Sequence, residues 1–171
     1  EQYFKPYPVC RWAQPAVEAA ESLLASASVA AGEIERVEVE TFGHGVRLGT
    51  ALPASTEAAQ YALGFPLAAY LVRRKIGAAE VGASGLNDPE IAAMAARIAL
   101  SEDPEISARF PAKRYARVRI RTRAGRTLES ELTAARGDPD SPLADAEIIS
   151  KFEKLAETLG AERTRAIRDA T

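Results

Sequence analysis

The residues best suited to chemistry lie together in the segment 4–16, which carries two cations, three prolines, and the only Cys and the only Trp of the chain. Because proline fixes φ and lacks an N–H, residues 5–8 are expected to be extended. Pro15 instead precedes helix-forming residues and suits a first helical position, which makes Gln14 the expected N-cap. Arg11 and Gln14 would then flank unpaired backbone N–H groups, which attract carboxylates. The sequence therefore predicts a binding site for a small acid.

Each of these residues also has a structural alternative. Lys5 and Arg11 could bind substrate carboxylates, or lie along the surface and in an ion pair. Gln14 could bond a ligand, cap the helix, or do both. Cys10 has no local base to activate it as a nucleophile, so a small buried residue is expected. His44, between two glycines, is expected in a loop and is an acid–base candidate only as the sole His.

Length and composition indicate one globular domain, residues 1–171, with a packed core: 47% of residues are hydrophobic, 27% are charged and the net charge is −2. This balance argues against nucleic-acid or anionic-membrane partners, and no membrane span is expected. One Cys excludes an internal disulfide, and one Cys with one His argues against a zinc site. The chain starts at Glu1 without Met, so we expect a fragment of a longer protein. No signal peptide is visible in the sequence, and the expected location is the cytoplasm.

The first half of the chain shows helical and strand periodicity in turn. A helix is expected over 15–27, followed by a half-buried strand over 33–41. Ser55 or Thr56 can cap a second helix, apolar nearly all round from 61 to 72 and therefore buried. Pro66 predicts either a kink or a helix that starts after Gly64. Core packing is favoured for Gln60 and Tyr61 over a position at a domain boundary.

The second half begins with a short helix expected over 77–85 and a clear helix start at Asp88-Pro89. Residues 101–106 are polar and expected to be extended at best. A last main helix is expected over 145–159, stopped by Gly160 and followed by a short terminal helix over 161–170. Its inward face is expected to carry four apolar residues, namely Ile148, Phe152, Leu155 and Leu159.

Residues 115–122 and 127–132 give the strongest hairpin pattern in the chain. A three-residue loop, 123–125, pairs Arg119 with Glu129 and Ile120 with Leu128, and it places Gly125 where a left-handed residue is needed. The outer face then becomes a solvated ladder of Arg and Glu rather than a nucleic-acid patch. Helices and strands mix without a βαβ rhythm, so we expect an α+β fold with a small antiparallel sheet packed against helices in two layers.

Six segments, in this order, carry a resemblance to a known family. They are FKPYPVCRWAQPAVEA, PASTEAAQYALGFPLAAYLV, LNDPEIAAMAARI, EDPEISARFPA, TRAGRTL and RGDPDSPLADAEIISKF. Together they resemble the C-terminal domain of the MmgE/PrpD family, which includes 2-methylcitrate dehydratase, cis-aconitate decarboxylase and iminodisuccinate epimerase. The resemblance covers nearly the whole chain.

The resemblance implies a dimeric, two-domain enzyme in which an α+β domain closes over a cleft of a larger helical N-terminal domain. It implies a lyase that acts on small di- or tricarboxylates, without metal or organic cofactor, by proton abstraction beside a carboxylate. Loss of water or CO2 follows, or reprotonation in an epimerase or isomerase. Several catalytic groups belong to the helical domain, so the isolated chain is expected to be inactive.

Two positions depart from the family's pattern. The position of Gln14 is usually His, and Gln cannot exchange a proton near neutral pH. The position of Phe65 is often Tyr, and Phe lacks the hydroxyl. No catalytic residue is therefore assigned in this domain, and Arg11, Gln14, Lys5 and Phe65 are its expected substrate-binding residues. The alternative is a non-catalytic module for dimerisation or ligand binding.

Overall fold

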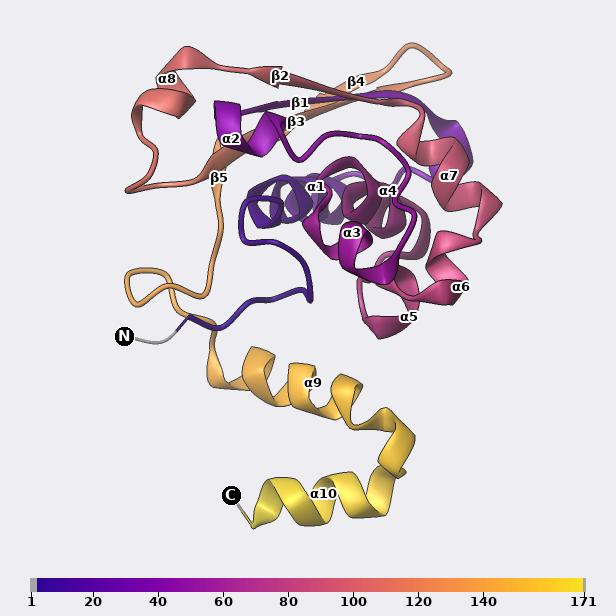
Figure 1. Ribbon diagram of the computed structural model, residues 1–171, viewed down its shortest axis with the longest axis vertical. Helices are drawn as coiled ribbons and strands as arrows, with labels where there is room; N and C mark the ends of the chain where they lie inside the picture. Colours follow the sequence, from indigo (N-terminus) through magenta and orange to yellow (C-terminus); the bar gives the residue numbers. More distant parts are fainter. Residues whose placement is uncertain (1–2, 171) are drawn as a thin grey trace. The chain divides into compact units, whose positions relative to one another are not determined.

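The computed structural model describes residues 3–170 of the chain (Figure 1). These residues form two compact units. The larger unit is Tyr7–Ala135. The smaller unit joins the described residues before Tyr7 to those from Arg136 onward.

The larger unit is built on a mixed sheet in which the strand order is β2-β1-β3-β4, with β5 paired to β3. The strands are β1 (Ile34–Thr41), β2 (Ile98–Glu102), β3 (Tyr115–Thr122), β4 (Thr127–Glu129) and β5 (Thr133–Ala134). The α+β class is confirmed. The expected purely antiparallel sheet is wrong at one pair, because β2 runs parallel to β1. Parallel neighbours need a long crossover, and the helical segment between β1 and β2 supplies it.

The hairpin has the predicted register. Arg119 pairs with Glu129 and Ile120 with Leu128, and Gly125 adopts the positive φ of 79° that its turn requires. The charged face is the predicted ladder, in which Arg119 and Glu129 approach to 2.7 Å and Arg117 and Glu40 to 3.0 Å.

Helices cover only one face of this sheet (Figure 1). Valine and isoleucine side chains on the inner face are fully buried against two helices, α1 (Gln14–Ser26) and α4 (Gly64–Arg73). The inner-face residues are Val37, Val39, Val118 and Ile120. This alternation of buried and charged positions along β1 and β3 separates the core from the charged face.

Helix α1 begins one residue earlier than expected. It starts at Gln14, and Ala13 precedes it without a side-chain cap. The predicted N-cap role of Gln14 is therefore wrong. The Gln14 side chain bonds back to the preceding segment instead of capping its own helix.

The apolar segment after Ser55 forms two helices rather than one kinked helix. Ser55 accepts a hydrogen bond from Ala58 N–H and starts α3 (Thr56–Tyr61). The chain then becomes extended at Ala62 before α4 starts at Gly64, so the second predicted alternative is the closer one. A Cβ at Gly64 would lie 2.8 Å from the Cα of Thr50, and glycine permits this close approach.

The remaining helices of the larger unit are short. The predicted Asp88 cap starts α7 (Pro89–Ala95), and the expected helix over 77–85 forms two turns, α5 (Ala78–Val81) and α6 (Ala83–Leu86). Residues 101–106 are not simply extended, because Asp103 and Pro104 repeat the Asp-Pro start signal and begin α8 (Pro104–Ala108). Two further turns are η1 (Ala31–Glu33) and α2 (Gly43–Val46).

The smaller unit contains α9 (Asp145–Leu155), η2 (Glu157–Leu159) and α10 (Ala161–Asp169). Gly160 connects η2 to α10 and has a positive φ of 80°. The expected helix to residue 159 is too long, and the inward positions expected for Leu155 and Leu159 are wrong, because both side chains are exposed. Helix α9 ends at Leu155, and the next residue, Ala156, is buried in place of the two leucines.

Candidate functional site

The segment before α1 makes a tight turn that ends at Arg11 and Trp12. Ala13 N–H donates to Cys10 O at 3.0 Å, and Gln14 N–H donates to Arg11 O at 3.3 Å. Both Arg11 and Trp12 are half-buried. The turn therefore fixes the backbone that carries the predicted carboxylate-binding cation, directly before the first helix.

Gln14 holds this segment from inside the protein. Its side chain is fully buried. The amide nitrogen Nε2 donates to the carbonyl oxygens of Tyr7 at 2.9 Å and Val9 at 3.0 Å, and Oε1 accepts from Tyr7 N–H at 3.3 Å. Both amide protons are thus used, so Gln14 orients the backbone before Arg11 rather than presenting a donor to solvent.

A second link ties the same segment to the core helices. Tyr7 Oη donates to Glu21 Oε2 at 2.6 Å, and the Tyr7 ring meets the Tyr70 ring edge-on at 6.2 Å. Burial, followed by the hydrogen bond to Glu21, raises the pKa of Tyr7 well above its ordinary value. Burial, followed by the Glu21 charge, raises the pKa of Tyr70 to about 12. Both phenols therefore stay protonated at neutral pH and act as hydrogen-bonding and packing groups.

Trp12 brings together three segments that are far apart in the sequence. Its ring centroid lies 5.4 Å from that of His44, 5.9 Å from that of Phe110 and 6.2 Å from that of Phe42. Phe42 and Phe110 stack at 4.9 Å, and His44 lies 5.0 Å from Phe110. His44 is exposed and lies in α2 rather than in the expected loop. We call these four residues the Trp12 cluster.

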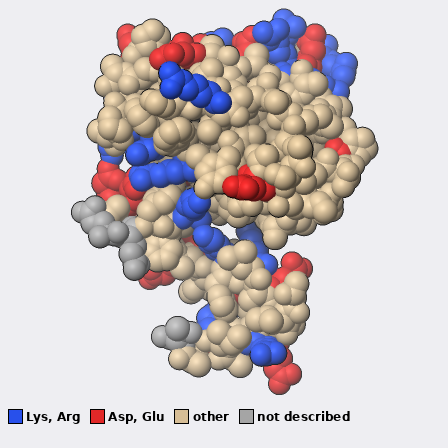
Figure 2. All heavy atoms as spheres, viewed as in Figure 1, with Lys and Arg blue, Asp and Glu red and all other residues tan. Residues whose placement is uncertain are grey.

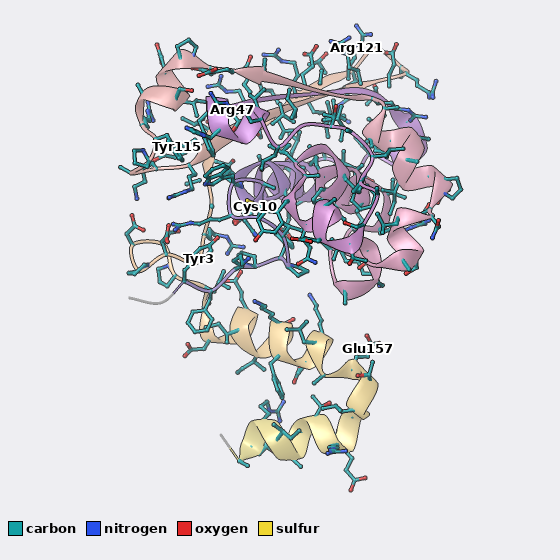
Figure 3. The ribbon with its side chains drawn as sticks, in the orientation of Figure 1. Tyr3, Cys10, Arg47, Tyr115, Arg121 and Glu157 are labelled. Carbon is teal, nitrogen blue, oxygen red and sulfur yellow. The ribbon has the colours of Figure 1, made fainter. Side chains whose placement is uncertain are left out.

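Polar and charged groups surround the Trp12 cluster. The guanidinium of Arg114 lies 5.8 Å from the centre of the Phe110 ring, and that of Arg109 lies 5.4 Å from the centre of the Tyr115 ring. Arg47 at the end of α2 and Tyr115 at the start of β3 lie at the same end of the sheet (Figure 3). Arginine on an aromatic face keeps its charge and its donors available.

A serine connects the backbone of α2 to an acidic side chain. Gly43 N–H donates to Ser107 Oγ at 2.9 Å, and Ser107 Oγ donates to Glu102 Oε1 at 2.6 Å. A Cβ at Gly43 would lie 2.7 Å from that carboxylate. Glycine at this position therefore lets β2 and α2 approach closely and fixes the helix that carries His44.

The segment before α1 also contacts the end of α3. Cys10 N–H donates to Gln60 O at 2.7 Å. Tyr61, the next residue, is 63% exposed, so the favoured core packing of Tyr61 is wrong. Phe65 is the opposite case, since it is 1% exposed and packs in the core. Cys10 itself is half-buried rather than fully buried.

Lys5 belongs to the smaller unit and is exposed. Its backbone carbonyl accepts a hydrogen bond from Lys151 Nζ at 2.6 Å. Burial, followed by the charge of Lys5, lowers the pKa of Lys151. The predicted site residues thus divide between the two units: Arg11, Gln14 and Phe65 lie in the larger, and Lys5 in the smaller.

The contribution of residues 109–114 was not predicted from the sequence. This segment supplies Phe110 and Arg114 to the surroundings of Trp12. The sequence RFPAKR places one aromatic residue among three cations, which could have indicated a binding segment. Only the contact of Phe110 with Trp12, about a hundred positions earlier, connects this segment to the candidate site.

The charged face of the sheet is a different kind of surface. A hollow on this face is lined by Arg36, Glu38, Arg119, Arg121 and Thr127. Positive and negative side chains alternate over the sheet (Figure 2), and the arginines pair with glutamates, as Arg121 does with Glu35 at 3.1 Å. Exposed, mutually paired charges of this kind indicate a solvated face.

The described residues contain neither a metal-binding cluster nor a membrane-spanning helix. Among residues 3–170, no group of three or more His, Cys, Asp or Glu side chains is arranged to hold a metal ion. Within the same range, every helix is too short or too polar to cross a membrane.

Comparison with known protein families gives a match over nearly the whole chain. A family model described as the MmgE/PrpD C-terminal domain matches residues 7–171. A search of the curated proteins finds no match to the chain. The matched range contains the turn at Arg11, the Gln14 hydrogen bonds and the Trp12 cluster.

Proposed function

The chain belongs to the MmgE/PrpD family as its C-terminal domain, and on that premise we propose that it closes the active site of a cofactor-independent lyase for small di- or tricarboxylates. The family implies enzymes of lyase or isomerase type. In the proposed reaction a base removes the proton beside a substrate carboxylate, and elimination of water or loss of CO2 follows. Reprotonation at the same carbon would make the enzyme an epimerase or isomerase instead.

The observation that carries the proposal is the fixed position of Arg11 at the start of α1. Two hydrogen bonds from the buried Gln14 side chain and one from Tyr7 to Glu21 hold the segment that leads to it. A guanidinium matches a carboxylate in two parallel hydrogen bonds, so an arginine carried by this fixed backbone suits a small polycarboxylate. Binding of a substrate carboxylate also favours the carbanion-forming step, because it orients the adjacent C–H bond.

The other expected substrate-binding residues have unequal parts in this proposal. Lys5 lies in the smaller unit and is an exposed cation, and its part in binding a carboxylate stays a prediction. Gln14 and Phe65 act from behind the site, since the first is fully buried and the second is 1% exposed. Neither Gln14 nor Phe65 can exchange a proton near neutral pH, so we assign the proton-moving groups to a helical N-terminal domain. We propose that the full-length protein is a cytoplasmic homodimer.

A second candidate is a non-catalytic module for dimerisation or ligand binding. It is favoured by the positions of Gln14 and Phe65, because neither side chain presents a reacting atom at the surface. The two candidates differ in turnover by the full-length protein.

The experiment compares full-length wild-type protein with Arg11→Gln, and with Arg121→Gln as a matched control on the charged sheet face. We expect turnover of at least one di- or tricarboxylate by the wild type. Because a charged hydrogen bond is worth about 1.5–3 kcal/mol, Arg11→Gln should lower kcat/KM by roughly ten- to a hundredfold, and Arg121→Gln should leave it unchanged. Turnover insensitive to Arg11→Gln would remove Arg11 from the site, and absence of turnover would favour the non-catalytic module.

A further inference from the structure

Lys151 is a half-buried lysine of α9 that the proposed function has not used. Lysine side chains usually lie along the surface with the ammonium in water. The ammonium of Lys151 instead donates a hydrogen bond to the backbone carbonyl of Lys5 at 2.6 Å. A charged donor makes this a stronger bond than one between two neutral groups. Lys151 therefore acts on the backbone of a residue that is expected to bind substrate.

The residue before Lys5 is held as well. Phe4 N–H donates to the carbonyl oxygen of Gly137 at 3.1 Å. Gly137 has a positive φ of 97°, and a Cβ at this position would lie 1.9 Å from the carbonyl oxygen of Phe4. Glycine is therefore needed for the two backbones to approach. Two successive residues of the segment, Phe4 and Lys5, are thus fixed by hydrogen bonds to their backbone.

Both supports lead back to α9. Glu147 in its first turn forms an ion pair with Arg136 at 2.7 Å, and Arg136 directly precedes Gly137. Glu147 and Lys151 are four residues apart, so they lie on the same face of the helix. One carboxylate of α9 thus holds the turn that bonds Phe4, and one ammonium of α9 holds Lys5.

The residue after Lys5 restricts it further. Pro6 has a fixed φ, and a residue before proline is limited to an extended backbone. The side chain of Lys5 is exposed. Its ammonium is therefore open to a ligand, while the backbone that carries it is restrained on both sides.

We propose that Lys151 is a positioning residue that holds Lys5 for the binding of a substrate carboxylate. This inference rests on the proposed function, because it takes Lys5 to contact a small di- or tricarboxylate. A side chain on a restrained backbone loses less conformational freedom on binding than one on a mobile segment, so its contact is stronger. Lys151 touches no substrate in this proposal and acts only through Lys5.

The test measures the Kd of citrate by calorimetry, and kcat and KM for any carboxylate that is turned over, on the full-length protein. Lys151→Met removes the ammonium, and it should raise Kd and KM by roughly three- to thirtyfold, as expected for coupled residues. The change in kcat should be less than about twofold, because the lost interaction is equal in the ground and transition states. Lys151→Arg keeps a charged donor and should recover most of the binding. Lys154→Met removes an exposed lysine from the same helix and should behave as the wild type.

A double-mutant cycle shows whether Lys151 acts through Lys5. In a Lys5→Met protein, the further change Lys151→Met should leave the Kd of citrate unaltered. Additive losses would overturn the inference, since they would mean that Lys151 affects binding without Lys5. A lower kcat at unchanged KM would overturn it too, because a residue that only stabilises the smaller unit lowers the amount of active protein.

The outcomes separate this inference from the proposed function. Citrate binding that depends on Lys151 through Lys5, in a protein without turnover, supports the positioning role and contradicts the lyase. Turnover with a KM that Lys151→Met leaves unchanged supports the lyase and overturns the positioning role. A protein that neither binds citrate, malate or succinate nor turns over any carboxylate overturns both.

Discussion

The side-chain nitrogen of Gln14 lies 3.0 Å from the carbonyl oxygen of Val9, five residues earlier in the chain. The same nitrogen lies 2.9 Å from the carbonyl oxygen of Tyr7. One buried amide thus closes the segment that leads to Arg11 onto the first turn of α1. The consequence is that Gln14, at the position where the resemblance predicts the family's usual His, has a structural task in this protein.

Removal of this amide should destabilise the domain. Gln14→Ala removes the side-chain donor shared by the Tyr7 and Val9 carbonyls and the acceptor of Tyr7 N–H, and a buried unsatisfied group costs roughly 1–3 kcal/mol. We expect a loss of about 2–4 kcal/mol in the free energy of unfolding, measured by urea titration. Gln60→Ala is the control, since its side chain donates only one exposed hydrogen bond, to Thr56. An equal loss in the two variants would contradict the role of Gln14.

Restoration of the family's usual residue at this position should not restore its chemistry. Neutral histidine has a single N–H donor and cannot satisfy both the Tyr7 and Val9 carbonyls. Gln14→His should therefore be less stable than the wild type in urea and should not increase the turnover of the full-length enzyme. Higher turnover together with unchanged stability would show that the segment can reorganise around an imidazole.

Alkaline conditions should weaken the fold through Tyr7 and Tyr70. Both have a pKa raised above the ordinary value of about 10 by burial and by Glu21. Their stabilising contribution is fully present below about pH 10 and is lost as the pH rises, because the unfolded state ionises first. Urea titrations at increasing pH should show this loss in the wild type and a smaller loss in Tyr7→Phe. Tyr115→Phe serves as the control, and an identical alkaline loss in all three proteins would rule out the cluster as its source.

A hydroxyl at position 65 should be poorly tolerated. Phe65 is 1% exposed, and a buried hydroxyl without a partner costs about 1–3 kcal/mol. Phe65→Tyr should lower the free energy of unfolding by that amount in urea, whereas Tyr61→Phe, at a 63% exposed position, should change it little. A Phe65→Tyr variant as stable as the wild type would indicate that the ring can reach a polar surface.

The sequence predicted those elements whose signals are local. The hairpin register followed from the alternation of Arg and Glu with apolar residues, and the Asp88 cap from its Asp-Pro pair. The parallel pairing of β1 with β2 could not be predicted in this way, because strand direction depends on the path of the whole helical crossover. The same Asp-Pro pair at Asp103 starts α8, where no helix was predicted.

The candidate site was predicted only in part, for a related reason. The position of Arg11 before a helix is a local feature, and the sequence showed it. The contacts of Trp12 with His44 and Phe110 join positions far apart in the chain, which no local pattern encodes. The side chain of Gln14 was expected at the helix start, and its use against the preceding backbone depends on the fold of that segment.

The most direct test of the central claim is proton exchange by the full-length protein in D2O with a panel of di- and tricarboxylates. The proposed lyase or isomerase should place deuterium at the carbon beside a carboxylate, or release water or CO2, with at least one of them. The 171-residue chain alone should do neither. Failure of the full-length protein to exchange, eliminate or decarboxylate any member of the panel would contradict the account, as would turnover by the chain alone.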